Sequence, residues 1–168
     1  DDFKKFDNFD YNKVFIEPIR PIEISEDQIL LIAVGRNEKE MMPSFFDHYR
    51  KLGVNQFAVL DNCSDDGSID YLMRSQDTFI FSSSNDYNRS NYGVAWQKLM
   101  SNFFINVKKI LIVDFDEFLI YEQMDSVNLN DYVKGSNEKF VSSILIDFYG
   151  KNIDNNTKNF FPKTSEEI

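Results

Sequence analysis

Four short apolar segments, each followed by a polar cluster, constrain the fold of this chain more than any other feature. The segments are residues 29–34, 56–60, 78–81 and 109–113. The first is apolar throughout, rather than alternating, which is typical of a strand buried on both faces in a parallel sheet, and the other three are apolar after a polar first residue. Helical patterns lie between these segments, at 38–52, 68–75 and 92–106. The alternation of strand and helix predicts an α/β fold, with a mostly parallel sheet flanked by helices.

The rest of the chain surrounds this pattern. Residues 1–25 mix acids, aromatics and two prolines, and we expect an extended lead-in there. The pattern predicts one domain over 26–150, completed by a short helix at 129–133 and a strand at 141–146, and 151–168 is a polar segment. Because the chain starts without Met and stops in polar sequence, we expect it to be a piece of a longer protein.

Composition excludes several classes of protein. The 168 residues carry 28 acids against 18 bases, for a net charge of −10. This balance argues against nucleic acid as a partner and against a polybasic membrane contact. A hydrophobic content of 42% is too high for a disordered chain, and the one cysteine, Cys63, cannot form an internal disulfide. No apolar run approaches the ~20 residues of a membrane span.

Asp114 and Asp116 follow the last of the four apolar segments directly. In an extended segment, residues two apart point to the same side, so both carboxylates would face one point. Two carboxylates facing one point favour a hard divalent cation such as Mg²⁺ or Mn²⁺, which keeps its other positions for water and phosphates. The alternative is a pair of solvated loop acids, one of which caps a helix.

Asp61 ends the second apolar segment, and Asp65, Asp66 and Gly67 follow closely. Carboxylates at a strand end, before a tight turn, suit hydrogen bonds to ribose hydroxyls or to a base edge, and this makes Asp61 and Asp66 candidate ligand-binding residues. The alternative is ordinary turn chemistry combined with capping of the helix that follows.

Two further clusters contain arginine. Gly35 would let a ligand approach the backbone, while Arg36 could contact a phosphate and Asn37 a base or sugar. Arg89 stands just before a predicted helix, where a helix N-terminus beside a guanidinium can hold an anion such as a diphosphate. A plain strand-to-helix turn capped by Asn37, and a solvated loop at 88–91, are the alternatives.

Three other reactive or aromatic residues are expected to be structural. His48 lies among aromatic residues at helical spacing, which favours a partly buried histidine over a ligand, and Trp96 is expected in the core. Cys63 lies in a hydrophilic turn without a histidine placed as its base, so we do not expect a nucleophile.

Five segments of the chain match, in order, the motifs of a known group of enzymes. They are 34–38 (VGRNE), 45–57 (FFDHYRKLGVNQF), 61–68 (DNCSDDGS), 96–99 (WQKL) and 114–118 (DFDEF). Together they resemble the nucleotide-sugar half of GT-A glycosyltransferases of the family-2-like group, over about residues 30–150. The resemblance implies a GT-A, Rossmann-like fold and transfer of a sugar from a nucleoside-diphosphate sugar, a UDP-sugar above all, to an acceptor hydroxyl.

The resemblance also implies roles for particular residues. Asp114 and Asp116 match the DxD motif that binds Mn²⁺ or Mg²⁺ on the donor diphosphate, and Asp61 matches the acid that meets the uridine or ribose. Arg36 and Asn37 match a nucleotide-contacting stretch. The implied acceptor is a glycan or glycoconjugate in surface-polysaccharide synthesis. The implied location of the protein is cytoplasmic, with peripheral association at the inner face of the membrane as a further option.

The chain departs from this group after the DxD motif. The group often has Trp and then Phe-Gly in the next strand, where this chain reads ILIDFYG over 144–150. Only 52 residues follow Asp116 (168 − 116), so the acceptor-binding side is expected to be truncated, and we name no catalytic base. Two other functions stay open: a haloacid-dehalogenase-like phosphohydrolase with Asp114 as nucleophile and Asp116 as acid/base, and a non-catalytic sugar-nucleotide-binding module.

Overall fold

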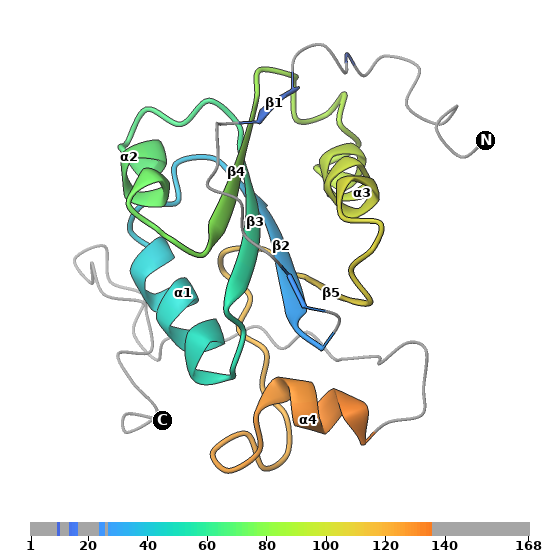
Figure 1. Cartoon of the computed structure of the whole chain (residues 1–168). Helices are drawn as coiled ribbons and strands as arrows, with labels where there is room; N and C mark the ends of the chain where they lie inside the picture. Colours follow the sequence, from blue (N-terminus) through green and yellow to red (C-terminus); the bar gives the residue numbers. More distant parts are fainter. Residues whose placement is uncertain (1–9, 11–13, 17–23, 26, 136–168) are drawn as a thin grey trace.

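The computed structural model describes residues 10, 14–16, 24–25 and 27–135, and its centre is a five-stranded sheet (Figure 1). The strands are β1 (Val14–Ile16), β2 (Ile29–Gly35), β3 (Gln56–Asp61), β4 (Thr78–Ser83) and β5 (Lys109–Ile112). Their order in the sheet is β1-β4-β3-β2-β5. The last four are parallel, and β1 pairs antiparallel with β4. The predicted α/β fold with a mostly parallel, Rossmann-like sheet is therefore confirmed.

Helices cover both faces of this sheet. They are α1 (Met42–Lys51), α2 (Ser68–Met73), α3 (Val94–Phe103) and α4 (Leu129–Lys134). Helices α1 and α2 lie on one side of the sheet and α3 on the other (Figure 1). Helix α4 is tied to the C-terminal end of α1, where the Leu129 amide donates to the Leu52 carbonyl (2.8 Å). The loops that follow the parallel strands lie at the other end of the sheet, where the carboxyl ends of these strands meet.

Alternation along the buried strands produces two cores. In β2, Leu31 and Ala33 pack with α1, whereas Leu30 and Ile32 pack with Trp96 and the rest of α3. Since successive side chains of a strand point to opposite faces, a continuous apolar run is needed when both faces are covered. This is why the segments of β2, β3 and β4 were recognisable as parallel strands. The expectation of burial on both faces is wrong for β5, which lies at the edge of the sheet and leaves Ile110 and Ile112 exposed.

Helix ends differ from the pattern-based prediction by several residues. The backbone before α1 forms a turn in which the Glu38 carbonyl accepts from the Met41 and Met42 amides, so α1 begins at Met42 rather than near 38. Helix α3 begins only at Val94, because Tyr92 and Gly93 have positive φ. The predicted strand at 141–146 and the segment 151–168 lie outside the described residues, as does most of 1–25.

An ion pair joins α1 to the start of β4. Arg50 Nε and Nη2 donate to the two carboxylate oxygens of Asp77 (2.8 and 2.9 Å), and the guanidinium also lies over the rings of Phe46 and Phe57. Burial acts to raise the pKa of Asp77, but the hydrogen bonds and charge of Arg50 outweigh it and hold that pKa below its ordinary value. The pair therefore stabilises the fold most when Asp77 is ionised.

The variant Asp77→Asn is expected to lower the free energy of unfolding by about 1–2 kcal/mol at pH 7. The folded pKa lies below the unfolded value of about 3.9, so this contribution is complete above about pH 4–5 and lost as the pH falls through the folded pKa. Urea unfolding from pH 7 to pH 3 measures this, and the difference between the two proteins should shrink toward the acid end. The control Asp47→Asn removes an exposed pair with Lys51 and should change stability by under about 0.5 kcal/mol. A constant difference across the pH range would contradict the account.

Candidate functional site

A cavity of about 700 Å³ opens at the carboxyl ends of the four parallel strands. Strand β2 has β3 on one side and β5 on the other, so the chain changes direction across the sheet at β2. Ligands of open α/β sheets bind at such a point. The described lining residues come from the end of β2, from the loops after all four parallel strands and from α3: Val34, Gly35, Arg36, Glu38, Asn62, Cys63, Ser84, Asn85, Asp86, Tyr87, Trp96, Asp114, Phe115 and Asp116.

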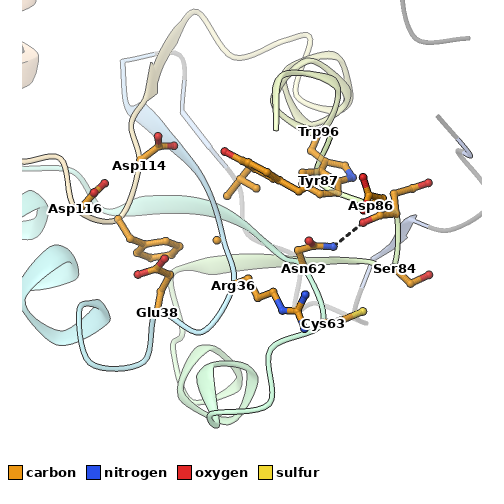
Figure 2. A pocket seen from close by; sticks show the side chains of 14 residues that line it. Arg36, Glu38, Asn62, Cys63, Ser84, Asp86, Tyr87, Trp96, Asp114 and Asp116 are labelled. Carbon is orange, nitrogen blue, oxygen red and sulfur yellow. Dashed lines mark hydrogen bonds between the residues drawn. The ribbon is translucent and has the colours of Figure 1, made fainter. Parts of the chain in front are cut away.

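Three carboxylates gather on one side of this cavity: Asp114, Asp116 and Glu38 (Figure 2). Partial burial raises the pKa of Asp114, and the charges of Glu117 and Asp116 raise it further. Burial is also the main cause of a raised pKa at Glu38, and the negative charges of Asp116, Asp66 and Asp114 raise it further. These groups repel one another, and a bound cation would relieve that repulsion.

The local conformation of the acidic loop differs from the extended segment that we expected. Strand β5 ends at Ile112, and Asp114 to Glu117 form a turn in which the Glu117 amide donates to the Asp114 carbonyl (3.1 Å). The Asp114 amide donates in return to Glu117 Oε2 (2.9 Å). Asp114 and Asp116 both reach the cavity, but a turn brings them there rather than the period of a strand.

The side chain of Phe115 anchors this turn in the core. It is only 2% exposed, and its ring centroid lies 4.7 Å from that of Phe45. A Cβ added to Gly35 would lie 2.7 Å from both Phe115 Cδ2 and Glu38 Cγ, so this close approach requires glycine. Burial of Phe115 therefore leaves the acids on either side of it facing outward.

Helix α1 holds the chain that follows the acidic turn. The Tyr49 hydroxyl donates to the Glu117 carbonyl (2.9 Å) and accepts from the Leu119 amide (3.2 Å). His48 Nε2 lies 2.9 Å from the Leu119 carbonyl, so this nitrogen carries the proton and donates it. Burial lowers the pKa of His48, which favours the neutral ring. His48 is thus partly buried among aromatic rings and bonded to the backbone, as its place in the sequence predicted.

Among the lining residues that the structure describes, Arg36 carries the one positive charge, and four others carry carboxylates. Its side chain is exposed and forms no hydrogen bond or ion pair with another residue in the part of the chain that the structure describes. A guanidinium without a carboxylate partner, at the end of β2, is available to a phosphate. The predicted phosphate contact of Arg36 is compatible with this position.

Asn37 and Asp66 instead connect two loops. The Asn37 amide donates to Ser64 Oγ (2.8 Å), and Asn37 Oδ1 accepts from the Asp65 amide (2.9 Å). Asp66 accepts from the amides of Lys39 (3.0 Å) and Ser68 (2.8 Å). Neither Asn37 nor Asp66 lines the cavity, and their bonds fix the loop after β2 against the loop after β3.

Asp61 and Arg89 also lie away from the cavity lining. Asp61 is 5% exposed, and its Oδ2 accepts from the Ser64 amide (3.0 Å). Arg89 is exposed, and its amide donates to Asp86 Oδ1 (3.2 Å). Of the predicted ligand residues, the structure therefore brings Arg36, Asp114 and Asp116 together around one cavity.

Sequence reasoning missed several lining residues, among them Glu38, Asp86 and Tyr87. Asn62 was predicted only as part of a turn. In the structure its Nδ2 donates to the Ser83 and Asn85 carbonyls (2.7 and 2.9 Å) and fixes the loop after β4 (Figure 2). The available signal was position, since Asp86 and Tyr87 follow closely after a predicted strand. Their types, an acid and a tyrosine in a polar loop, gave no further indication.

The acidic side of the cavity fits a divalent cation that is shared with a ligand. Among the described residues, no three His, Cys, Asp or Glu side chains are arranged to hold a metal ion by themselves. The side chains of Asp114 and Asp116 supply the hard oxygen ligands that Mg²⁺ and Mn²⁺ prefer. Such ions are often held by one or two carboxylates and completed by substrate phosphates, and the residues present fit that arrangement.

Comparison of the chain with protein-family models, curated proteins and solved structures found no match. Within the residues that the structure describes, no helix has both the length and the apolar character needed to cross a bilayer. Support for a function therefore comes from the residues of the cavity and their geometry.

Proposed function

We propose that the chain is a metal-dependent glycosyltransferase, or the donor-binding part of one, and that the cavity holds a nucleoside-diphosphate sugar. One observation carries the proposal. Asp114, Asp116 and Glu38 meet at the carboxyl edge of the parallel sheet, in a cavity that Arg36 also lines. The five segments that resemble family-2-like GT-A enzymes include these four residues.

The charge of the cavity specifies what kind of anion it can bind. Among the described lining residues, four carboxylates outnumber one guanidinium, and this excess of negative charge repels a bare diphosphate, because like charges at close range in a partly buried site cost free energy. A divalent cation that binds between the carboxylates and the diphosphate offsets much of this repulsion. The cavity is therefore suited to a metal–nucleotide complex and unsuited to a free nucleotide.

Different residues of the cavity would bind the metal ion and the phosphate. Asp114 and Asp116 would hold Mn²⁺ or Mg²⁺, and Arg36 would donate hydrogen bonds to a phosphate oxygen. When bound, the ion would neutralise the leaving diphosphate, so that an acceptor hydroxyl can displace it at the anomeric carbon. The proposed acceptor is a glycan or glycoconjugate at the cytoplasmic face of a membrane. We name no residue as base.

Thermal denaturation tests the proposal directly. UDP with Mn²⁺ is expected to raise Tm by several degrees, since a ligand at 100 times its Kd stabilises by about 2.7 kcal/mol. UDP alone and Mn²⁺ alone should each have a much smaller effect, because each completes only half of the site. GDP, and the matching sugar nucleotides, are run in parallel. No Tm response to any nucleotide with Mn²⁺ or Mg²⁺ would refute the proposal.

Turnover assays separate the other two functions. Phosphate release from p-nitrophenyl phosphate, lost in Asp114→Asn, would support a phosphohydrolase of the haloacid-dehalogenase type. In the structure, the acidic turn follows the fourth parallel strand rather than the first, which does not favour that function. Nucleotide binding without transfer or hydrolysis, even in a longer protein that includes this chain, would indicate a binding module.

A further inference from the structure

We propose that the ring of Tyr87 is the platform on which the nucleoside base stacks, and that Asp86 accepts a hydrogen bond from the same nucleoside. The inference rests on the proposed function, because it assigns the nucleoside end of the same cavity. It places the nucleoside on the loop after β4, whereas the sequence resemblance implied Asp61 after β3.

Exposure singles out Tyr87 among the aromatic residues of the cavity. Stacking requires a ring face that the ligand can reach. Of the three aromatic side chains that line the cavity, Trp96 is 0% and Phe115 2% exposed, whereas Tyr87 is 50% exposed. Figure 2 shows the Tyr87 side chain reaching from its loop toward the acidic side of the cavity. Within the described lining, Tyr87 is the residue that can offer a ring face.

The surrounding residues hold this ring in place before any ligand binds. The Tyr87 ring centroid lies 6.2 Å from that of the buried Trp96 and 5.8 Å from that of Tyr92. The Tyr87 carbonyl accepts from Ser90 Oγ (2.6 Å) and from the Tyr92 amide (3.0 Å). A preorganised ring loses little conformational freedom when a base stacks on it, which favours affinity.

Asp86 has an oxygen available for the nucleoside. Its Oδ1 accepts from the amides of Asn88 (2.9 Å) and Arg89 (3.2 Å), while its Oδ2 has no partner in the part of the chain that the structure describes. Base N–H groups and ribose hydroxyls are donors, so the cavity needs an acceptor at this end. Asp61, which is buried and bonded to the Ser64 amide, is poorly placed to serve.

This assignment separates the two ends of the ligand, and inorganic pyrophosphate probes one end alone. Tyr87→Ala is expected to weaken binding of UDP with Mn²⁺ about tenfold, the usual size of a base–aromatic stacking contribution. Its affinity for pyrophosphate with Mn²⁺ should stay within about twofold of wild type. Tyr87→Phe keeps the ring and should bind UDP nearly normally. Asp86→Asn keeps Oδ1, converts Oδ2 to a donor, and should weaken UDP more than pyrophosphate.

The chain supplies two intrinsic reporters of this end of the cavity. Trp96 is its one tryptophan and neighbours Tyr87, so titration of Trp96 fluorescence measures binding. Cys63 is its one cysteine, is exposed and lines the cavity. UDP with Mn²⁺ should slow alkylation of Cys63, and the Tyr87→Ala variant should need about ten times more UDP for the same protection. Tyr132→Ala changes an exposed tyrosine of α4 that does not line the cavity and whose ring packs against Tyr121; it is the matched control and should bind UDP within about threefold of wild type.

The outcomes distinguish this inference from the proposed function. Absence of nucleotide binding by the wild-type chain overturns both. If the wild-type chain binds UDP, but Tyr87→Ala and Tyr87→Phe bind it equally well, the stacking platform is refuted and the metal–diphosphate end stands. An equal loss of UDP and pyrophosphate affinity in Tyr87→Ala also refutes it, because the effect would then not be specific to the base.

Discussion

Asp116→Asn is expected to abolish the rise in Tm that UDP produces with Mn²⁺, and to lower UDP affinity by about 100-fold or more. Loss of an outer partner of a metal ligand already costs about 10–100-fold in metal affinity, and this substitution removes a charged ligand itself. Asparagine has nearly the shape of aspartate, so the loop should keep its form. Isothermal titration with UDP and Mn²⁺ measures the loss.

The stability of the ligand-free variant provides an independent check. Asp116 is exposed, and its charge contributes to the raised pKa of Glu38 and of Asp114, so removing it relieves repulsion. We expect the Tm of the free protein to stay equal or to rise slightly, while the ligand response disappears. Asp125→Asn changes an exposed acid that does not line the cavity and should respond to UDP as wild type does. An Asp116→Asn protein that still binds UDP with Mn²⁺ normally would show that Asp116 is not a metal ligand.

Phe115→Ala is expected to lower the free energy of unfolding by about 3–5 kcal/mol, the usual cost of truncating a buried phenylalanine. The ring lies 4.7 Å from that of Phe45 and 6.5 Å from that of Phe46, and it closes against Gly35. Its loss leaves a cavity beneath the acidic turn and frees the adjacent carboxylates to move. Urea unfolding measures the first effect, and titration with UDP and Mn²⁺ measures the second.

A second pair of variants keeps this prediction testable if Phe115→Ala does not fold. Phe115→Leu retains most of the volume and should cost about 1–2 kcal/mol, with a smaller loss of UDP affinity. Phe103→Ala removes a ring of α3 that is 52% exposed and packs against Phe81 and Phe104 at the edge of the core, and should cost about 1 kcal/mol without affecting UDP. Equal costs for Phe115→Ala and Phe103→Ala would contradict the anchoring role of Phe115.

Strand positions were predictable because burial on both faces leaves a continuous apolar run in the sequence. Strands β2 and β3 agree with the predicted segments to within one residue at either end. Helix starts were less predictable. They depend on turns such as that of Glu38, whose carbonyl accepts from two amides, and this bonding leaves no mark in apolar periodicity.

The site was predictable only in part. The prediction that Asp114 and Asp116 follow a strand end correctly located the acidic side of the cavity. The rule that residues two apart point to the same side did not apply to them. That rule assumes extended backbone, and the turn closed by the Glu117 amide replaces it. Glu38 lies in the segment 34–38 that carries part of the resemblance, but it was given no role, because it meets Asp114 and Asp116 only where the loops after β2 and β5 come together.

The sequence by itself determined the α/β architecture and the edge of the sheet at which the polar loops gather, because burial and strand direction are encoded in local apolar patterns. Only the tertiary structure decided which of those polar residues face the cavity. The Asp61 carboxylate accepts from the Ser64 amide of its own loop, and Asn37 Oδ1 accepts from the Asp65 amide of the neighbouring loop, while Asp86 and Tyr87 remain open to a ligand. Those bonds join residues that are distant in sequence or depend on the shape of a turn, so no local pattern specifies them.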